Sequence, residues 1–207
     1  MPSTSALRRE PAAEAPAQIK PGSRERLLKA AVDAFCRAGY FAVSVEDIVR
    51  EAGVSRMTFY RHFSSKAALA LDLFGRNVEH GLPRFVAIAA ADFGDRVTVE
   101  RWIGSLFDAD RQSGQLLRVF IQANAGEPDF TNSAQELIGN LIAELGKGIP
   151  AFAIDRETGR RRWLEAWLLI YEILDQSNHA ARGAGIAAEP EVIGILADRF
   201  VAFATGR

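Results

Sequence analysis

The 207-residue sequence predicts an all-α fold, and three observations support this prediction. Apolar residues recur three or four positions apart in most segments after residue 22, which is the spacing of one face of a helix. Serine residues precede several of these segments, and glycine or proline follows them, as expected at helix starts and ends. Two short segments meet at a glycine, which predicts a helix-turn-helix. We therefore expect an N-terminal three-helix domain followed by a larger helical bundle.

The glycine corner lies between residues 44 and 63. Ser44 is a good N-cap for the first helix, in which Asp47 covers free N–H groups of the first turn. Gly53 ends that helix because glycine readily adopts the left-handed conformation. Ser55 then caps a second helix, predicted from Arg56 to Phe63, which must leave at a steep angle. A helix that buries its phenylalanine edge in this way can offer its remaining surface to DNA.

The other helices follow from the same signals. A helix from Ser23 to Ala38, ended by Gly39, is expected to complete the three-helix domain. Ser65 should cap a helix that runs toward His80, with a break at Gly81 and Pro83. Further helices are predicted at residues 84–91, 96–109 and 116–125, from Thr131 or Asn132 to 145, at 160–181, and from 189 or 190 to 203.

The last two predicted helices are apolar on more than one side. A helix that packs against a single core needs only one apolar stripe. The wider apolar surfaces comprise Trp163, Leu164, Trp167, Leu168, Ile170, Tyr171 and Leu174 in one helix, and Val192, Ile193, Ile195, Leu196, Phe200, Val201 and Phe203 in the other. We therefore expect a two-fold homodimer in which these helices form a four-helix bundle.

Charge is distributed unevenly along the chain, although the formal net charge is only −1. Residues 20–66 contain nine Lys or Arg and five Asp or Glu, a net charge of +4. Residues 67–207 contain 14 basic and 19 acidic residues, a net charge of −5. The basic excess coincides with the helix-turn-helix, as phosphate binding requires.

Several classes of protein are disfavoured by the sequence. A single cysteine, Cys36, allows no intramolecular disulfide, and we find no signal peptide and no apolar run long enough for a membrane span. The histidines at 62, 80 and 179 have no metal-binding spacing, and no Gly-x-Ser-x-Gly motif or glycine-rich phosphate loop occurs. We expect a cytoplasmic protein that is not an enzyme and needs no metal or cofactor.

Residues 1–21 are rich in alanine, proline and charge without periodicity, and we expect them to be a disordered N-terminal arm. Arg8, Arg9 and Lys20 leave open a contact with DNA phosphates or the minor groove. A solvated tail is the alternative.

Residues 24–69 resemble the tetracycline-repressor (TetR) family of bacterial transcription regulators. The resemblance rests on the runs RLLKAAVDAFCRAGY, VSVEDIVREAGVS and TFYRHFSSKAAL. The chain departs from the usual pattern at two positions. Family members often have a smaller or more polar residue in place of Met57 and an acidic residue in place of Ala67. The resemblance implies a DNA-binding domain at residues 22–68 and an effector-binding and dimerisation domain at 69–207. It also implies a repressor that a small-molecule effector releases from a palindromic operator.

The resemblance also assigns roles at the DNA. Arg56 and Arg61 are the expected contacts to base edges, and Thr58 is expected to contact a base or a thymine methyl group. The expected phosphate contacts are Ser44, Ser55, Tyr60, His62 and Lys66. Purely structural roles remain open for several of these residues: the serines are N-caps in any case, His62 may simply cover Phe63, and Tyr60 may be half core.

An effector cavity inside the C-terminal bundle is implied by the resemblance alone. Its expected lining consists of aromatic residues in the middle helices with nearby polar groups: Trp102, Phe107, Phe120, Gln122, Asn124, Trp167 and Tyr171. Core packing is the alternative for the aromatic residues. The acidic body favours a cationic or neutral lipophilic effector. A helix-turn-helix protein without a small-molecule effector, switched by a protein partner, is the competing prediction.

Overall fold

The computed structural model of the chain describes residues 22–183 and 189–206, so the predicted disordered arm at residues 1–21 lies outside the described residues. Every regular element in the described part is a helix, which confirms the all-α fold. The elements are α1 (Ser23–Ala38), α2 (Val45–Ala52), α3 (Arg56–His62), α4 (Lys66–Val86), the short 3₁₀ helix η1 (Ala87–Ala90), α5 (Arg96–Gln112), α6 (Gly114–Gly126), α7 (Pro128–Gly146), the 3₁₀ turn η2 (Pro150–Phe152), α8 (Arg160–Ala181) and α9 (Glu189–Thr205).

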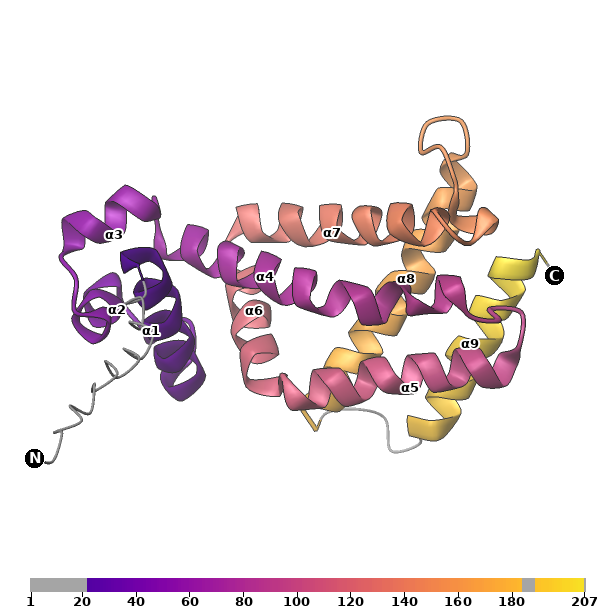
Figure 1. The fold of residues 1–207 in the computed structure, drawn as a ribbon, viewed down its shortest axis with the longest axis horizontal. Coiled ribbons are helices and arrows are strands. Elements are labelled where there is room, and N and C mark those ends of the chain that lie inside the picture. The colour runs from indigo at the N-terminus through magenta and orange to yellow at the C-terminus, as the bar shows by residue number, and fades with distance from the viewer. Residues whose placement is uncertain (1–21, 184–188, 207) are drawn as a thin grey trace, which may run out of the picture.

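Helices α1 to α3 form a compact group at one end of the molecule (Figure 1). The predicted caps of α2 are confirmed: Ser44 Oγ accepts a hydrogen bond from the Asp47 amide at 3.1 Å, and Asp47 Oδ2 accepts one from the Ser44 amide at 3.0 Å. Gly53 ends the helix in the left-handed conformation, with φ of 62°. Ser55 caps α3 through the Thr58 amide. These local interactions fix the turn between α2 and α3.

Helix α4 is longer than predicted, because Gly81 and Pro83 do not interrupt it. A proline inside a helix loses one hydrogen bond and costs about 3 kcal/mol. The burial of Phe85, two residues beyond the proline, offsets this cost: its ring packs edge-on against Trp102 of α5. The indole nitrogen of Trp102 also donates to the carbonyl oxygens of Arg84 and Phe85, at 3.2 and 3.1 Å. The predicted helix at residues 84–91 is therefore the end of α4 followed by η1.

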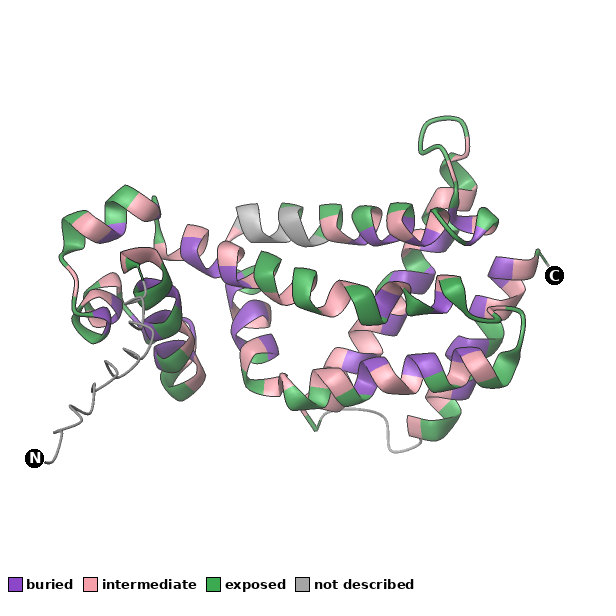
Figure 2. Ribbon diagram, in the orientation of Figure 1, coloured by how far each residue is buried: buried purple, intermediate pink, exposed green. Residues whose placement is uncertain are grey.

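The C-terminal body is arranged around α5, which packs against both α8 and α9. Helix α4 reaches from the three-helix group into this body (Figure 1). The helices turn their buried residues toward one another and expose their outer faces (Figure 2). The range of α8 is the predicted one, α9 ends two residues later than predicted, and α7 begins at Pro128 rather than near Thr131. No described helix has the length and hydropathy that a membrane span requires.

Helix α6 joins the two ends of the molecule. Its buried residues Leu117, Val119, Phe120 and Ala123 share one hydrophobic cluster with α1, α2, α3 and the first turns of α4. The other large cluster is formed by α5, α7, α8, α9 and the end of α4. The packing of α6 therefore links the position of the helix-turn-helix to the body.

Candidate DNA-binding surface and effector cavity

Helix α3 lies along the upper side of the three-helix group in the view of Figure 1. Phe59 is fully buried and anchors the helix, with its ring centroid 5.9 Å from that of Phe63. The opposite face is open: Met57 is 84% exposed and Tyr60 46% exposed. Arg56 and Arg61 are exposed as well. The helix thus buries one edge and presents two guanidinium groups, a phenol and a thioether to solvent.

The two arginines of α3 are held differently. Arg56 forms an ion pair with Glu46 of α2 at 2.8 Å, and its guanidinium lies 5.6 Å from the centroid of the Tyr60 ring. Arg61 makes no ion pair within residues 22–183 and 189–206. Arg56 must therefore exchange a carboxylate partner to contact DNA, whereas Arg61 is available without that exchange.

The serines and the threonine predicted to contact DNA all take part in helix capping. Ser44 Oγ bonds to Asp47, and hydrogen bonds from Ser44, together with Arg50, lower the pKa of Asp47 to about 2. Ser55 Oγ lies 2.9 Å from Thr58 Oγ1. These hydroxyl groups are exposed at helix N-termini, where backbone N–H groups also favour anions.

His62 and Lys66 are bound within the three-helix group. His62 Nε2 lies 2.7 Å from Ser23 Oγ at the start of α1. Lys66 Nζ donates to the carbonyl oxygens of Tyr40 and Val43, at 2.8 and 2.9 Å, and lies 4.2 Å from the centroid of the Tyr40 ring. Burial lowers the pKa of Lys66. Both side chains therefore have structural partners in addition to the phosphate contacts predicted for them.

Met57 is a residue of the exposed α3 face that the predicted DNA contacts omit. Its side chain stands beside Arg56, and only 16% of its surface is covered. Its position off the Phe59 and Phe63 edge was the available signal, because helical spacing predicts that a residue there faces away from the core.

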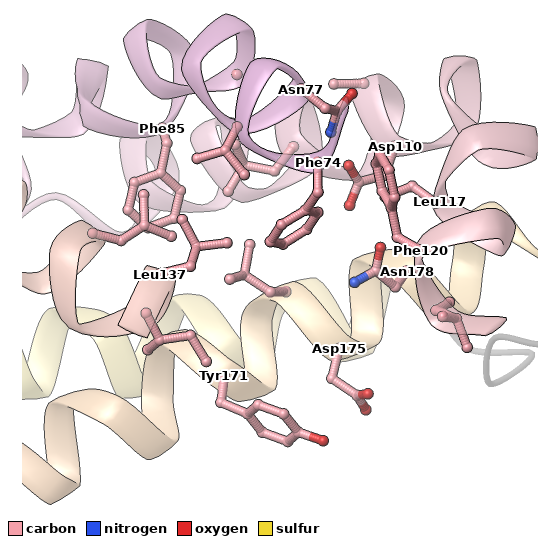
Figure 3. A pocket seen from close by; sticks show the side chains of 18 of the residues that line it. Phe74, Asn77, Phe85, Asp110, Leu117, Phe120, Leu137, Tyr171, Asp175 and Asn178 are labelled. Carbon is pink, nitrogen blue, oxygen red and sulfur yellow. The ribbon is translucent and has the colours of Figure 1, made fainter. Parts of the chain in front are cut away.

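A cavity of about 490 Å³ lies among α4, α5, α6, α7 and α8 (Figure 3). This volume falls within the range of roughly 300–1,000 Å³ typical of small-molecule sites. Its walls are mainly apolar, with polar side chains at a few points: Asn77, Arg84, Asp110, Asn124, Asp175, Asn178, His179 and Arg182. Such a combination suits an apolar ligand oriented by a small number of hydrogen bonds.

Three of the seven predicted cavity residues line it, namely Phe120, Asn124 and Tyr171. The structure does not bring the other four to the cavity. Trp102 and Phe107 are buried in the core of the body. Trp167 stacks on Tyr171, with ring centroids 5.2 Å apart. Gln122 lies off the α6 face that carries Phe120 and Asn124, since those two are four residues apart and Gln122 falls between them.

Gln122 instead contacts the loop between α1 and α2. Its Oε1 accepts a hydrogen bond from the Tyr40 amide at 2.7 Å, and the hydroxyl of Tyr40 donates to Glu127 Oε1 at 2.9 Å. Gly39 has a φ of 86°, and a Cβ there would lie 3.1 Å from Gln122 Oε1. The end of α6 is therefore hydrogen-bonded to the loop that precedes the helix-turn-helix.

Asp110 is a partly buried carboxylate of the cavity wall. Its Oδ2 accepts a hydrogen bond from Ser177 Oγ at 2.5 Å. Burial raises the pKa of Asp110, against the lowering effects of Ser177 and Arg84. The sequence held a signal for this residue: positions 99, 103, 106 and 110 form one helical stripe that is apolar except at Asp110.

The raised pKa of Asp110 predicts a pH-dependent loss of stability. The folded state binds this proton more tightly than the unfolded chain, so the stabilisation is present below the unfolded pKa of 3.8 and is lost as pH rises through the folded pKa. Asp110→Asn should therefore raise the melting temperature by a few degrees at pH 7 and have less effect near pH 4. The melting temperatures of wild type and variant are compared between pH 4 and pH 7 by thermal unfolding. Asp108→Asn, at an exposed position of α5, is the control. Equal effects of Asp110→Asn at both pH values would contradict the expectation.

A three-helix group with an exposed second helix of the turn, joined to a helical body, defines the class of helix-turn-helix transcription regulators. Residues 27–73 match the family described as "Bacterial regulatory proteins, tetR family". This match covers the three-helix group and the start of α4, so this part of the chain is identified as a helix-turn-helix domain of the TetR family.

Relatives of known sequence are also transcription regulators. The chain is 42% identical to the HTH-type transcriptional activator FasR of Mycolicibacterium smegmatis over 57 residues, which are 28% of this chain and 26% of FasR. It is 26% identical to the HTH-type transcriptional regulator RutR of Escherichia coli over 159 residues, 76% of this chain and 73% of RutR. The similarity to FasR thus spans about a quarter of that protein.

Solved structures share the fold. A TetR-family transcriptional regulator from Mesorhizobium loti superposes with a TM-score of 0.59 and 18% identity, covering 89% of this chain and 96% of that one. The likeness extends through the C-terminal body and therefore includes the elements that form the cavity.

Proposed function

We propose that the protein is a cytoplasmic transcriptional repressor that binds a palindromic operator as a homodimer and is released by a small molecule in the cavity. The observation that carries the proposal is the exposed face of α3, anchored by buried Phe59 and open at Arg56, Met57 and Arg61. A helix of this kind can enter the major groove, where arginine pairs with guanine and an apolar group contacts the thymine methyl.

The role of each side chain in DNA binding follows from its partners within the protein. Arg61 and Arg56 read base edges, with Arg56 exchanging Glu46 for DNA, and Met57 or Thr58 contacts a thymine methyl. Ser44, Ser55 and Tyr60 contact phosphates from the outer ends of α2 and α3. His62 and Lys66 act mainly by holding α1, α3 and α4 together, since their polar atoms bond to Ser23, Tyr40 and Val43.

Arg61→Ala should cost about 1–3 kcal/mol of discrimination at one base pair of the operator. Binding to random duplex should change much less, because the lost contact reads a base. Fluorescence anisotropy with the operator and with single-base variants measures this difference. Lys29→Ala, an exposed position of α1 that pairs with Asp33, is the control and should leave discrimination unchanged. An equal loss on every duplex would show that Arg61 contacts only phosphates.

The proposed dimer face is an apolar stripe on α8 and α9. Leu164, Leu168 and Tyr171 are 44, 60 and 47% exposed, and their spacing places them on one side of α8. Ile195 of α9 is 57% exposed. A two-fold axis through this face would place two copies of α3 in successive major grooves, about 34 Å apart.

The cavity favours a small-molecule effector over the competing model of a regulator switched by a protein partner. Helix α6 lines the cavity with Phe120 and Asn124 and holds Tyr40 with Gln122. A ligand that binds better to a different position of α6 would shift the population toward dimers with wrongly spaced α3 helices and so release the operator.

The proposal is tested by binding of the purified protein to DNA. A footprint on the DNA flanking its own gene should reveal an inverted repeat, and this repeat should bind more tightly than random duplex of equal length. A monomer in solution, or no preference for any inverted repeat, would refute the proposal.

A further inference from the structure

We propose that the effector is a lipophilic amine, whose protonated nitrogen donates hydrogen bonds to the Asp110 carboxylate and the Asn178 amide oxygen. The inference rests on the proposed function in taking the cavity as the effector site. It adds the chemical class of the ligand, which neither the family nor the relatives' names specify.

Two acceptors at one end of the cavity have no donor among the described residues. Ser177 Oγ bonds to Asp110 Oδ2 at 2.5 Å, and the described residues provide no donor to Asp110 Oδ1. Asn178 Oδ1 is buried and has no hydrogen-bond partner in the part of the chain that the structure describes. Asn178 follows Ser177 in α8, so the hydrogen bond from Ser177 brings the Asp110 and Asn178 side chains to the same end of the cavity (Figure 3).

An unpartnered buried acceptor is costly, at about 1–3 kcal/mol, and a ligand donor removes that cost. The Asp110 carboxylate beside Asn178 Oδ1 favours a ligand with a positively charged donor over a ligand with a neutral one. Burial already raises the pKa of Asp110, which means that the surrounding protein disfavours its anion. A ligand cation would reverse this effect by favouring the anion.

The other charged groups of the wall do not favour an anionic ligand at this end. Asp175 adds a second carboxylate, 3.7 Å from His179 Nε2. Arg182 is engaged through Nε with the Asn178 backbone carbonyl at 3.2 Å, and Arg84 is exposed. A ligand carboxylate next to Asp110 and Asn178 Oδ1 would be repelled by the Asp110 carboxylate, and the positive charge of Arg84 already acts on Asp110.

The rest of the cavity calls for an apolar body. Phe85 and Leu137 lie together, away from the acceptor end, and Phe74 and Phe120 lie nearer to it (Figure 3). A molecule with an aromatic ring, a flexible apolar chain and a terminal amine matches this separation of apolar and acceptor groups.

The experiment compares three probes that share one skeleton: 6-phenylhexylamine, 6-phenylhexan-1-ol and 6-phenylhexanoate. Binding to the full-length protein is measured by isothermal titration calorimetry at pH 7. The amine should bind about tenfold or more tightly than the alcohol and the acid, as expected for a hydrogen bond to a charged group. Equal or tighter binding of the acid would overturn the proposal, and so would an absence of amine binding.

Three variants assign the effect to the acceptors. Asp110→Asn keeps the shape of the side chain and the acceptor for Ser177, and should weaken amine binding about tenfold while leaving alcohol binding within about twofold. Asn178→Leu should weaken the amine by a smaller factor. Asp108→Asn, on the exposed side of α5, should change neither. Loss of affinity for all three probes in Asp110→Asn would indicate a damaged cavity and contradict the assigned role.

Failure of this inference is distinguishable from failure of the proposed function. Operator binding by the unliganded protein tests the function and requires no probe. If the protein binds the operator but binds the amine no more tightly than the alcohol or the acid, the proposed ligand class is wrong and the proposed function as a regulator still stands.

Discussion

Replacing Leu168 and Ile195 together by aspartate is expected to convert the protein to a monomer and to weaken operator binding by about 100-fold or more. Both side chains are more than half exposed in the single chain, on the two helices proposed to form the dimer. Burying such a side chain contributes about 1.5–3 kcal/mol, and a two-fold face counts each one twice. Four carboxylates placed in that face would instead have to be desolvated.

The effect on DNA follows from bivalency. A dimer binds its second half-site as an intramolecular step, and this raises overall affinity by about 10²- to 10⁴-fold over a single site. The monomer should bind one half-site and the whole operator with nearly the same affinity. Analytical ultracentrifugation measures the mass, and anisotropy with whole and half operators measures the binding.

Val97→Asp is the control for the dimer prediction. Val97 is an apolar residue of α5 that is 56% exposed and lies outside the proposed face. The Val97→Asp variant should remain dimeric and bind the operator with wild-type affinity. A dimer that survives the double substitution in α8 and α9 would place the interface elsewhere on the body.

Features set by neighbouring residues were predictable from the sequence. The N-caps at Ser44, Ser55 and Ser65 and the left-handed Gly53 depend on contacts within a few residues, and all appear as predicted. The continuation of α4 past Pro83 was not predictable in this way. It depends on Trp102, 19 residues away in the sequence, whose indole holds the carbonyl groups beyond the proline.

The site residues show the same limit. The buried edge of α3 at Phe59 follows from its spacing, but the Lys66 bonds to Tyr40 and Val43 depend on how α4 meets the loop after α1. Aromatic residues such as Trp102 and Phe107 suit either a ligand cavity or a hydrophobic core, so their residue type alone does not distinguish the two. Only the packing of α5 against α8 and α9 assigns them to the core.

The second large effect is expected from Gln122→Leu, which should uncouple the cavity from the operator. Gln122 supplies the acceptor for the Tyr40 amide and does not line the cavity. Removing that acceptor leaves a backbone N–H of a nearly fully buried residue without its partner and loosens the grip of α6 on the loop before α2.

Allosteric couplings typically change affinity by about 5- to 150-fold, and that factor should fall toward one in Gln122→Leu. The measurement is operator affinity with and without a phenylhexyl probe that binds the wild-type cavity. Probe affinity itself, measured without DNA, should stay within about threefold of wild type, because the cavity wall is intact.

Gln115→Leu separates the specific contact from a general effect of leucine on α6. Gln115 is exposed on the same helix, so this variant should release the operator as the wild type does. If Gln122→Leu also releases normally, the signal must pass through α4 instead, since α4 contacts the cavity with Phe74 and Asn77 and begins at Lys66 beside the same loop. The contacts of Tyr40 favour the route through α6, because Gln122 of α6 and Glu127 directly after α6 both bond to it, whereas α4 contributes Lys66 alone.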